Sequence, residues 1–232
     1  MKTNTPKATT KVFEQACALY DEIGKLANQG IGLDNDTTGT YETFNRLMEE
    51  YDFDPYVFEG EDGKKGLCRC DGIEILTARY DLIFVLPGNT FSPENQVFLT
   101  YRDLKEYLVN HCGDDIFTAD EIKLNNGFTT PAIFREGDKW GIVFSNGNVF
   151  VKPKYDRILF WPNGFFEVVN DGKYGLITPM AEMLDAVYDS VDFDEDGYIV
   201  VTKDDNKFFI DETGNLNPDE DEKYLNVEMY ID

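Results

Sequence analysis

The sequence is poor in the residue types from which most enzyme and metal sites are built. It has one histidine, His111, and four cysteines in 232 residues, too few cysteines for a disulfide-stapled scaffold. A zinc site could be drawn from Cys68, Cys70, His111 and Cys112, but small core or edge positions explain these residues better. Neither a Gly-x-Ser-x-Gly turn nor a phosphate-binding glycine loop is present. We therefore expect no catalytic residues, no metal and no cofactor.

Basic residues and long apolar runs are also scarce. Lys and Arg number 21 against 45 Asp and Glu, a net charge of −24. Such a surface repels nucleic-acid phosphates and anionic lipid, which excludes both as partners and favours a protein partner. No run approaches the ~20 apolar residues of a membrane span, and no apolar segment follows Lys2, Lys7 and Lys11 as in a signal peptide. The expected compartment is cytoplasmic, unless a leader has been removed.

One acidic segment resembles half of a calcium-binding loop. Asp192, Asp194 and Asp196 precede Gly197 at the spacing of an EF-hand, but Lys203 stands where the loop needs its bidentate glutamate. A turn between two strands accounts for these aspartates better, and we expect no tight calcium site.

What the sequence does contain is a repeat. Gly-Asp-Lys-Trp-Gly-Ile at 137–142 returns as Asp-Gly-Lys-Tyr-Gly-Leu at 171–176 and as Asp-Asn-Lys-Phe-Phe-Ile at 205–210. The aromatic members Trp140, Tyr174 and Phe208 are spaced 34 residues apart. A fixed period of this length indicates a modular array.

The rest of each period reads as β-structure. Tyr155-Asp156 and Tyr188-Asp189 follow the aromatic motif, and short runs of Val, Ile, Phe and Tyr alternate with Asn-Gly or Asp-Gly turns. The repeating aromatic residues are predicted to form the structural core of the array: Trp140, Tyr155, Tyr174, Tyr188 and Phe208. Replacing Trp140 with Ala is then expected to cost about 3–5 kcal/mol.

An earlier copy begins at residues 63–67, but the next aromatic motif arrives only at Trp140. We attribute the excess to a helical insert near 100–127. Its helical pattern consists of Leu104, Tyr107, Leu108 and His111, with Gly113 as the stop.

The N-terminal segment has helical periodicity. One helix is predicted over 10–30 with Thr10 as N-cap and Gly30 as its end, and a second over 41–51 with Thr40 as N-cap. The terminal unit of an array exposes an apolar face. Residues 1–55 are therefore predicted to be a helical cap, and residues 56–232 the β-repeat array.

These motifs resemble the WG (KWG) repeat family of bacterial proteins over roughly residues 57–232. The resemblance rests on Gly-Asp-Lys-Trp-Gly-Ile, Asn-Gly-x-Val, Lys-Pro-Lys-Tyr-Asp-x-Ile and Asn-Gly-Phe, closest over 137–169. It implies a β-rich repeat module, often used in interactions, without catalytic residues to carry over. The predicted fold is mainly β, with tandem antiparallel hairpins in a solenoid-like or partial-propeller array.

The function expected from the sequence is a non-catalytic protein-interaction or ligand-binding module. One alternative is an acidic antagonist, similar to an immunity protein, that neutralises a basic protein. Another is an enzyme with its site at the 100–127 insert. Trp161, with Phe160 beside it, is the candidate partner contact, because Trp161 has no aromatic counterpart in the next copy.

Overall fold

The computed structural model describes residues 5–85, 91, 96–124, 131–161, 165–177, 183–193, 198–210 and 216–217. The chain divides into two compact units, residues 1–118 and residues 119–232. No helix among the described residues is long and apolar enough to cross a membrane.

Two helices open the first unit, α1 (Thr10–Asn28) and α2 (Thr40–Glu50). The N-cap of α1 is Thr9, whose hydroxyl accepts from the Val12 amide, and not Thr10 as predicted. Thr40 is likewise inside α2 and is not its cap. The carboxylate of Asp36 lies close enough to accept the Tyr41 amide at 2.9 Å, so it supplies the capping oxygen from the preceding loop. A short 3-10 helix at Leu33–Asn35 lies in the same loop.

The helices pack on the end of the first β-sheet. An apolar cluster joins Phe13 and Leu47 of the two helices to Phe53 and to Cys70. Cys70 lies in the turn between β2 and β3, so the cluster attaches the helices to that turn rather than to a broad sheet face.

The remaining elements are antiparallel strands. The first unit holds a three-stranded sheet, β1 (Tyr56–Glu59), β2 (Lys65–Cys68) and β3 (Glu74–Tyr80), and a four-stranded one, β4 (Leu82–Phe84), β5 (Val97–Arg102), β6 (Lys105–Asn110) and β7 (Asp115–Ala119). The second unit holds three four-stranded sheets. Their strands are β8 (Glu121–Lys123), β9 (Ala132–Glu136), β10 (Lys139–Val143), β11 (Val149–Tyr155); β12 (Arg157–Phe160), β13 (Phe166–Asn170), β14 (Lys173–Ile177), β15 (Met183–Tyr188); β16 (Ser190–Phe193), β17 (Ile199–Lys203), β18 (Asn206–Ile210) and β19 (Leu216–Asn217). The prediction of a mainly β, antiparallel fold is confirmed.

The predicted helical insert is wrong. The described part of residues 100–127 forms the strands β5 to β8, and β5 and β6 pair as a hairpin closed by Asp103 and Leu104, both at positive φ. Leu108 and Val109 are both fully buried although they are adjacent in sequence. A strand buried on both faces gives a continuous apolar run, which periodicity alone does not distinguish from a helix. The segment is therefore a further hairpin of the same kind as its neighbours.

A single carboxylate ties together the corner between successive sheets. Asp156 follows the last residue of β11, and one of its oxygens accepts from Lys139 Nζ at 2.6 Å. The other oxygen accepts from the Asp171 amide in the tight β13–β14 turn at 2.7 Å. The Asp156 amide in turn donates to the Val169 carbonyl at 2.8 Å. Hydrogen bonds from Lys139 and from the turn amide lower the pKa of Asp156.

The same corner recurs along the chain. The next one is made by Asp189, Lys173 and Asp204. In the first unit Lys64 Nζ lies 2.6 Å from Asp81, whose amide donates to the Tyr101 carbonyl. At the start of the second unit Asp120 accepts the Gly137 amide at 2.8 Å.

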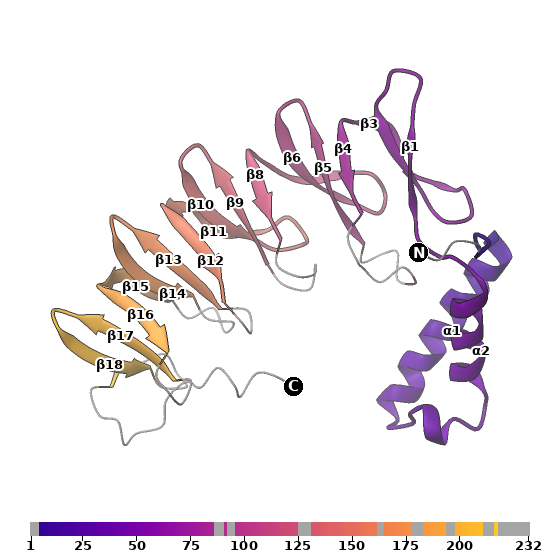
Figure 1. The fold of residues 1–232 in the computed structure, drawn as a ribbon, viewed down its shortest axis with the longest axis horizontal. Coiled ribbons are helices and arrows are strands. Elements are labelled where there is room, and N and C mark those ends of the chain that lie inside the picture. Colours follow the sequence, from indigo (N-terminus) through magenta and orange to yellow (C-terminus); the bar gives the residue numbers. More distant parts are fainter. Residues whose placement is uncertain are drawn as a thin grey trace. The chain divides into compact units, whose positions relative to one another are not determined.

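Apolar cores lie between consecutive sheets of the second unit. One contains Ile142, Tyr155 and Ile158 with Val168, and so joins β8–β11 to β12–β15. A second contains Leu176, Tyr188 and Ile199 and joins β12–β15 to β16–β19. Figure 1 shows these sheets following one another in chain order. Each of these sheets therefore shares a core with its neighbour along the chain.

The glycine of the aromatic-Gly motif marks a close backbone approach. A Cβ at Gly141 would lie 2.4 Å from the Val151 carbonyl oxygen and 2.9 Å from the Phe134 ring. We expect Gly141→Ala to lower the free energy of unfolding by about 1–3 kcal/mol, because the core has no room to expand. In contrast, a Cβ at Gly24 meets nothing within 4 Å inside α1, so Gly24→Ala should stabilise by about 1 kcal/mol. Urea unfolding measures both, and a Gly141→Ala protein as stable as the parent would contradict the close approach.

Candidate functional site

The repeating aromatic residues lie in or beside the cores of the second unit. Tyr155 and Tyr188 are 3% and 7% exposed, and each is paired across the ladder with the aromatic residue of the preceding strand, Trp140 and Tyr174. Those two are half-buried at the margin of the same cores. Lys123 Nζ lies 4.2 Å from the centroid of the Trp140 ring. Because part of this ring is exposed, its removal should cost less than removal of Tyr155.

Phe208 is not the counterpart of Tyr174. In the hairpin, Tyr174 pairs with Val169 one step from the tight turn, whereas the residue one step from the corresponding turn is Lys207. Phe208 therefore occupies the hairpin position that Gly175 occupies in the preceding sheet. The structural counterpart of Tyr174 is Lys207, which lies 33 residues later instead of 34. Its half-buried ring packs on the core around Tyr188.

The predicted partner contacts are engaged in packing. Trp161 is half-buried against the core that contains Leu176 and Tyr188. Phe160 is half-buried against the preceding core, and its ring centroid lies 5.5 Å from that of Phe166. Both rings thus contribute to the interior of the second unit, and neither is displayed as a free surface anchor.

Metal-ligating residues are not gathered in the described part of the chain. Among those residues, no three His, Cys, Asp or Glu side chains are grouped as ligands. Cys17, Cys68, Cys70 and Cys112 form no disulfide. Asp194 and Asp196 of the calcium-like segment lie outside the described residues.

The polar groups that do not recur are concentrated in the first unit, at the turn between β6 and β7. The Asn110 side-chain oxygen accepts the amides of Cys112 and Asp114 and fixes this turn. At its tip Cys112 Sγ lies 3.2 Å from His111 Nε2. His111 Nδ1 is buried and has no hydrogen-bond partner among the described residues.

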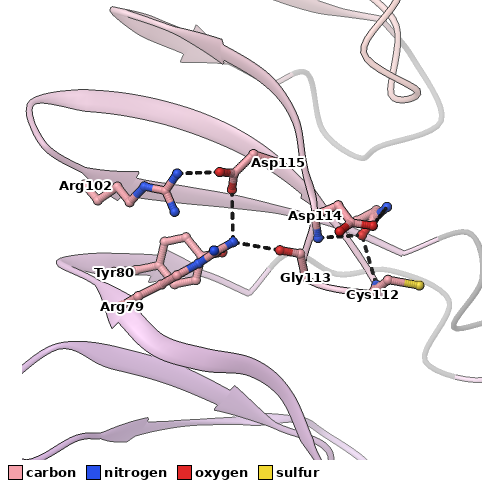
Figure 2. Close-up of polar contacts among 8 residues, drawn as sticks. Arg79, Tyr80, Arg102, Cys112, Gly113, Asp114 and Asp115 are labelled. Carbon is pink, nitrogen blue, oxygen red and sulfur yellow. Dashed lines mark hydrogen bonds and ion pairs between the residues drawn. The ribbon is translucent and has the colours of Figure 1, made fainter.

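Two arginines converge beside the same turn (Figure 2). Arg79 of β3 donates to the Gly113 carbonyl at 2.7 Å and to Asp115 of β7 at 3.3 Å. Arg102 of β5 donates to the other oxygen of Asp115. Arg79 also donates to the Tyr80 hydroxyl at 2.9 Å and 2.8 Å. Because Arg79 and Asp115 belong to different sheets, the cluster ties the three-stranded sheet to its neighbour.

His111 also reaches a small, mostly apolar cleft of about 180 Å³. The cleft is lined by Phe13, Phe53, Pro55, Arg69, Ile73, Glu74, Ile75, Gln96 and His111. Arg69 forms one wall, held by two bonds to Asp71 of 2.8 Å and 2.6 Å and lying 4.1 Å from the Phe13 ring centroid. The cleft therefore lies where the helices meet the β2–β3 turn.

This arrangement supports little chemistry. A cysteine nucleophile needs a base, and the base needs a third group that orients it. Cys112 and His111 supply the first two, but His111 Nδ1 has no orienting partner among the described residues. Arg79 and Arg102 are already engaged with Asp115. The Cys112–His111 pair thus supplies two of these three groups, and no described residue supplies the third.

The sequence reasoning did not single out the polar ties. The repeats do contain a pattern from which these ties could have been predicted. A lysine and an aspartate recur at nearly constant spacing, as Lys139 with Asp156 and as Lys173 with Asp189. The Arg79–Asp115–Arg102 cluster has no such signal, because its members come from three different strands.

The ion pair in the cleft wall should make stability depend on pH. The Arg69 guanidinium, more than any other neighbour, lowers the pKa of Asp71 from 3.8 to about 2. The stabilisation is thus present above about pH 3.8 and lost as the pH falls through 2. We expect Asp71→Asn to lower the melting temperature at pH 7 and the difference from the parent to shrink between about pH 4 and pH 2. Asp21→Asn, on the exposed face of α1, is the control. A difference that stays constant down to pH 2 would rule out this role.

The thiols should differ in reactivity. Cys112 is exposed at its turn, whereas Cys70 is buried, and burial raises the pKa of its thiol to about 11. Because the thiolate is the reactive form, Ellman's reagent at pH 8 should modify Cys112 first and Cys70 far more slowly, with mass spectrometry locating each adduct. Cys112→Ser should abolish the fast phase. Rapid modification of Cys70 would show that the helices do not cover it.

Comparison with known proteins bears on the second unit. Residues 140–174 match the family model described as the WG containing repeat. No curated protein matches the chain. Among solved structures, the chain is similar to the 1.35 Å crystal structure of a protein of unknown function from Bacteroides caccae. The identity is 11% and the TM-score 0.23, over 59% of this chain and 62% of that one, so less than two thirds of that protein is spanned.

The matched segment runs from Trp140 of one sheet to Tyr174 of the next, across the corner at Asp156. This match confirms the resemblance over residues 140–174, a part of the roughly 57–232 over which the sequence motifs carry it. In that segment the chain is similar to the WG containing repeat.

Proposed function

We propose that the chain is a non-catalytic protein-interaction module, built from successive WG-like hairpin sheets and closed at its N-terminal end by α1 and α2. The polar residues that recur, such as Lys139 and Asp156, are used in ties between strands. The Cys112–His111 pair lacks an orienting third group among the described residues. Both features argue against the alternative of an enzyme site in residues 100–127.

The observation that carries the proposal is the exposure of large apolar side chains on the edge strands β1 and β4 of the first unit. Leu82 and Phe84 of β4 are 52% and 44% exposed, and Tyr56 and Val57 of β1 are comparably open. Apolar side chains gathered on a surface typically mark a site of protein contact. A protein partner also fits the charge of −24, which opposes binding to nucleic acid.

The test is to capture partners from the source cell with the full chain, purify the protein found, and titrate it back. We expect saturable binding that Leu82→Asp and Phe84→Asp each weaken at least about tenfold, since a buried charge without a partner is costly. Leu104→Asp is the matched control, because Leu104 is an exposed leucine at the β5–β6 turn.

Two outcomes would contradict the proposal. One is a purified partner whose binding is unaffected by the β4 substitutions. The other is turnover of a substrate that disappears with Cys112→Ser or His111→Asn while the protein stays folded.

A further inference from the structure

Among the described residues, the first sheet lacks a strand that each of the other four sheets has. In the four-stranded sheets an outer strand, β4, β8, β12 or β16, pairs with the strand before the tight turn. β1 occupies that second position in its own sheet, since Phe58 pairs with Gly66 as Val168 pairs with Gly175. No described strand pairs with the outer edge of β1.

The backbone of β1 presents hydrogen-bonding groups at this edge that no described strand pairs with. The Gly60 amide donates to the Lys64 carbonyl at 2.8 Å, in register with the Phe58–Gly66 pair. Because bonded pairs alternate along an antiparallel ladder, Phe58 also faces β2. The N–H and C=O groups of Val57 and Glu59 therefore point away from β2, toward the open edge.

Side-chain exposure follows the same pattern. Tyr56 and Val57 are 39% and 42% exposed, whereas their counterparts in β13, Phe166 and Glu167, are 2% and 8% exposed. The corresponding residues of β5, β9 and β17 are buried as well: Phe98, Leu99, Ala132, Ile133, Ile199 and Val200. The same positions are thus covered wherever the outer strand is present.

The outer strands show what fits this edge. The residue opposite the Phe58 position is always a branched aliphatic: Ile83, Ile122, Ile158 and Val191. The next position, opposite the counterpart of Glu59, is Arg157 in β12 but Leu82, Glu121 and Ser190 in the other outer strands, so a basic residue there is argued from the charge around β1.

The surrounding charge argues against a second copy of this chain at the edge. Asp54, Glu61 and Asp62 flank β1 and form no ion pair with the described residues, whereas Glu59 is paired with Lys65 of β2. A second β1 would bring a second set of these carboxylates against the first, and like charges opposed across an interface are costly. A strand with basic residues beside its aliphatic centre suits the edge instead.

We propose that β1 accepts an extended segment of a partner protein as a fourth, antiparallel strand, with a branched aliphatic residue opposite Phe58 and Lys or Arg opposite Glu59. Strand addition of this kind takes its affinity from backbone bonds and its specificity from alternate side chains. This inference rests on the proposed interaction function and names its surface and its ligand.

The probe is a fluorescent peptide, Asp-Arg-Ile-Leu-Phe-Trp, which reproduces residues 156–161 and places Ile158 opposite Phe58. We expect saturable binding to the full chain and none by the same peptide with Ile158→Asp. Val57→Pro removes the outward N–H, which an edge strand tolerates, and should weaken binding at least about tenfold. Val57→Ala trims the same side chain, keeps the N–H and should bind within about threefold of the parent.

Amide exchange in the parent protein provides a second readout that does not depend on how Val57→Pro folds. The Val57 and Glu59 amides should slow on addition of the peptide. Absence of binding, binding that is equal in Val57→Pro, or unchanged exchange at these two amides would each overturn the inference. A dimer of the free chain that Val57→Pro dissociates, measured by sedimentation, would show that the occupant is a second copy and would also overturn it.

The captured natural partner separates failure of this inference from failure of the proposed function. If that partner binds Val57→Pro as well as the parent but is weakened by Leu82→Asp, the interaction function stands and the β1 edge is not its site. If no protein partner binds the parent at all, the proposed function fails, whatever the peptide does.

Discussion

The structure depends on one carboxylate at each corner. Asp156 binds Lys139 with one oxygen and the Asp171 amide with the other, so it fixes the last strand of one sheet to the tight turn of the next. The bond from its own amide to Val169 sets where the following strand begins. Because both carboxylate oxygens are occupied by donors, the corner has a defined geometry. The adjacent tyrosine is then directed into the core between the two sheets, as Tyr155 is.

This use of polar residues has a consequence for function. Where a lysine and an aspartate recur, they serve the backbone, and the same is true of the glycine that admits the Val151 carbonyl. What differs between sheets is found at the outer strands and turns: the exposed Leu82 of β4, where β12 has Arg157, the Arg79–Asp115–Arg102 cluster, and the edge of β1 that no described strand pairs with. Our proposal assigns recognition of a partner to these variable positions, because they can change without loosening the corners.

Sequence reasoning succeeded where the physical signal is local. Both helices follow from the spacing of their apolar residues, although the caps were placed one residue late, since the N-cap residues are Thr9 and Gly39. The antiparallel strands follow from the turn residues. The helical insert failed because Leu108 and Val109 are buried on opposite faces of one strand, and such a run has no period of two. Phe208 was assigned to the position of Tyr174, one residue away from its actual position in the hairpin. The register of the hairpin decides this position, and the spacing of aromatic residues in the sequence does not reveal the register.

The sequence by itself determined the repeating motifs, the β-rich class, the scarcity of histidine and cysteine, and the strongly negative charge, because each depends on residue type and on spacing within about one period. Only the tertiary structure decided that Trp161 packs on a core, that Arg79 and Arg102 share Asp115, and that no described strand pairs with β1 where an outer strand pairs with β5, β9, β13 and β17. Each of these depends on which strands become neighbours. Burial and backbone pairing between segments distant in sequence determine which strands become neighbours, and no local sequence pattern predicts that pairing.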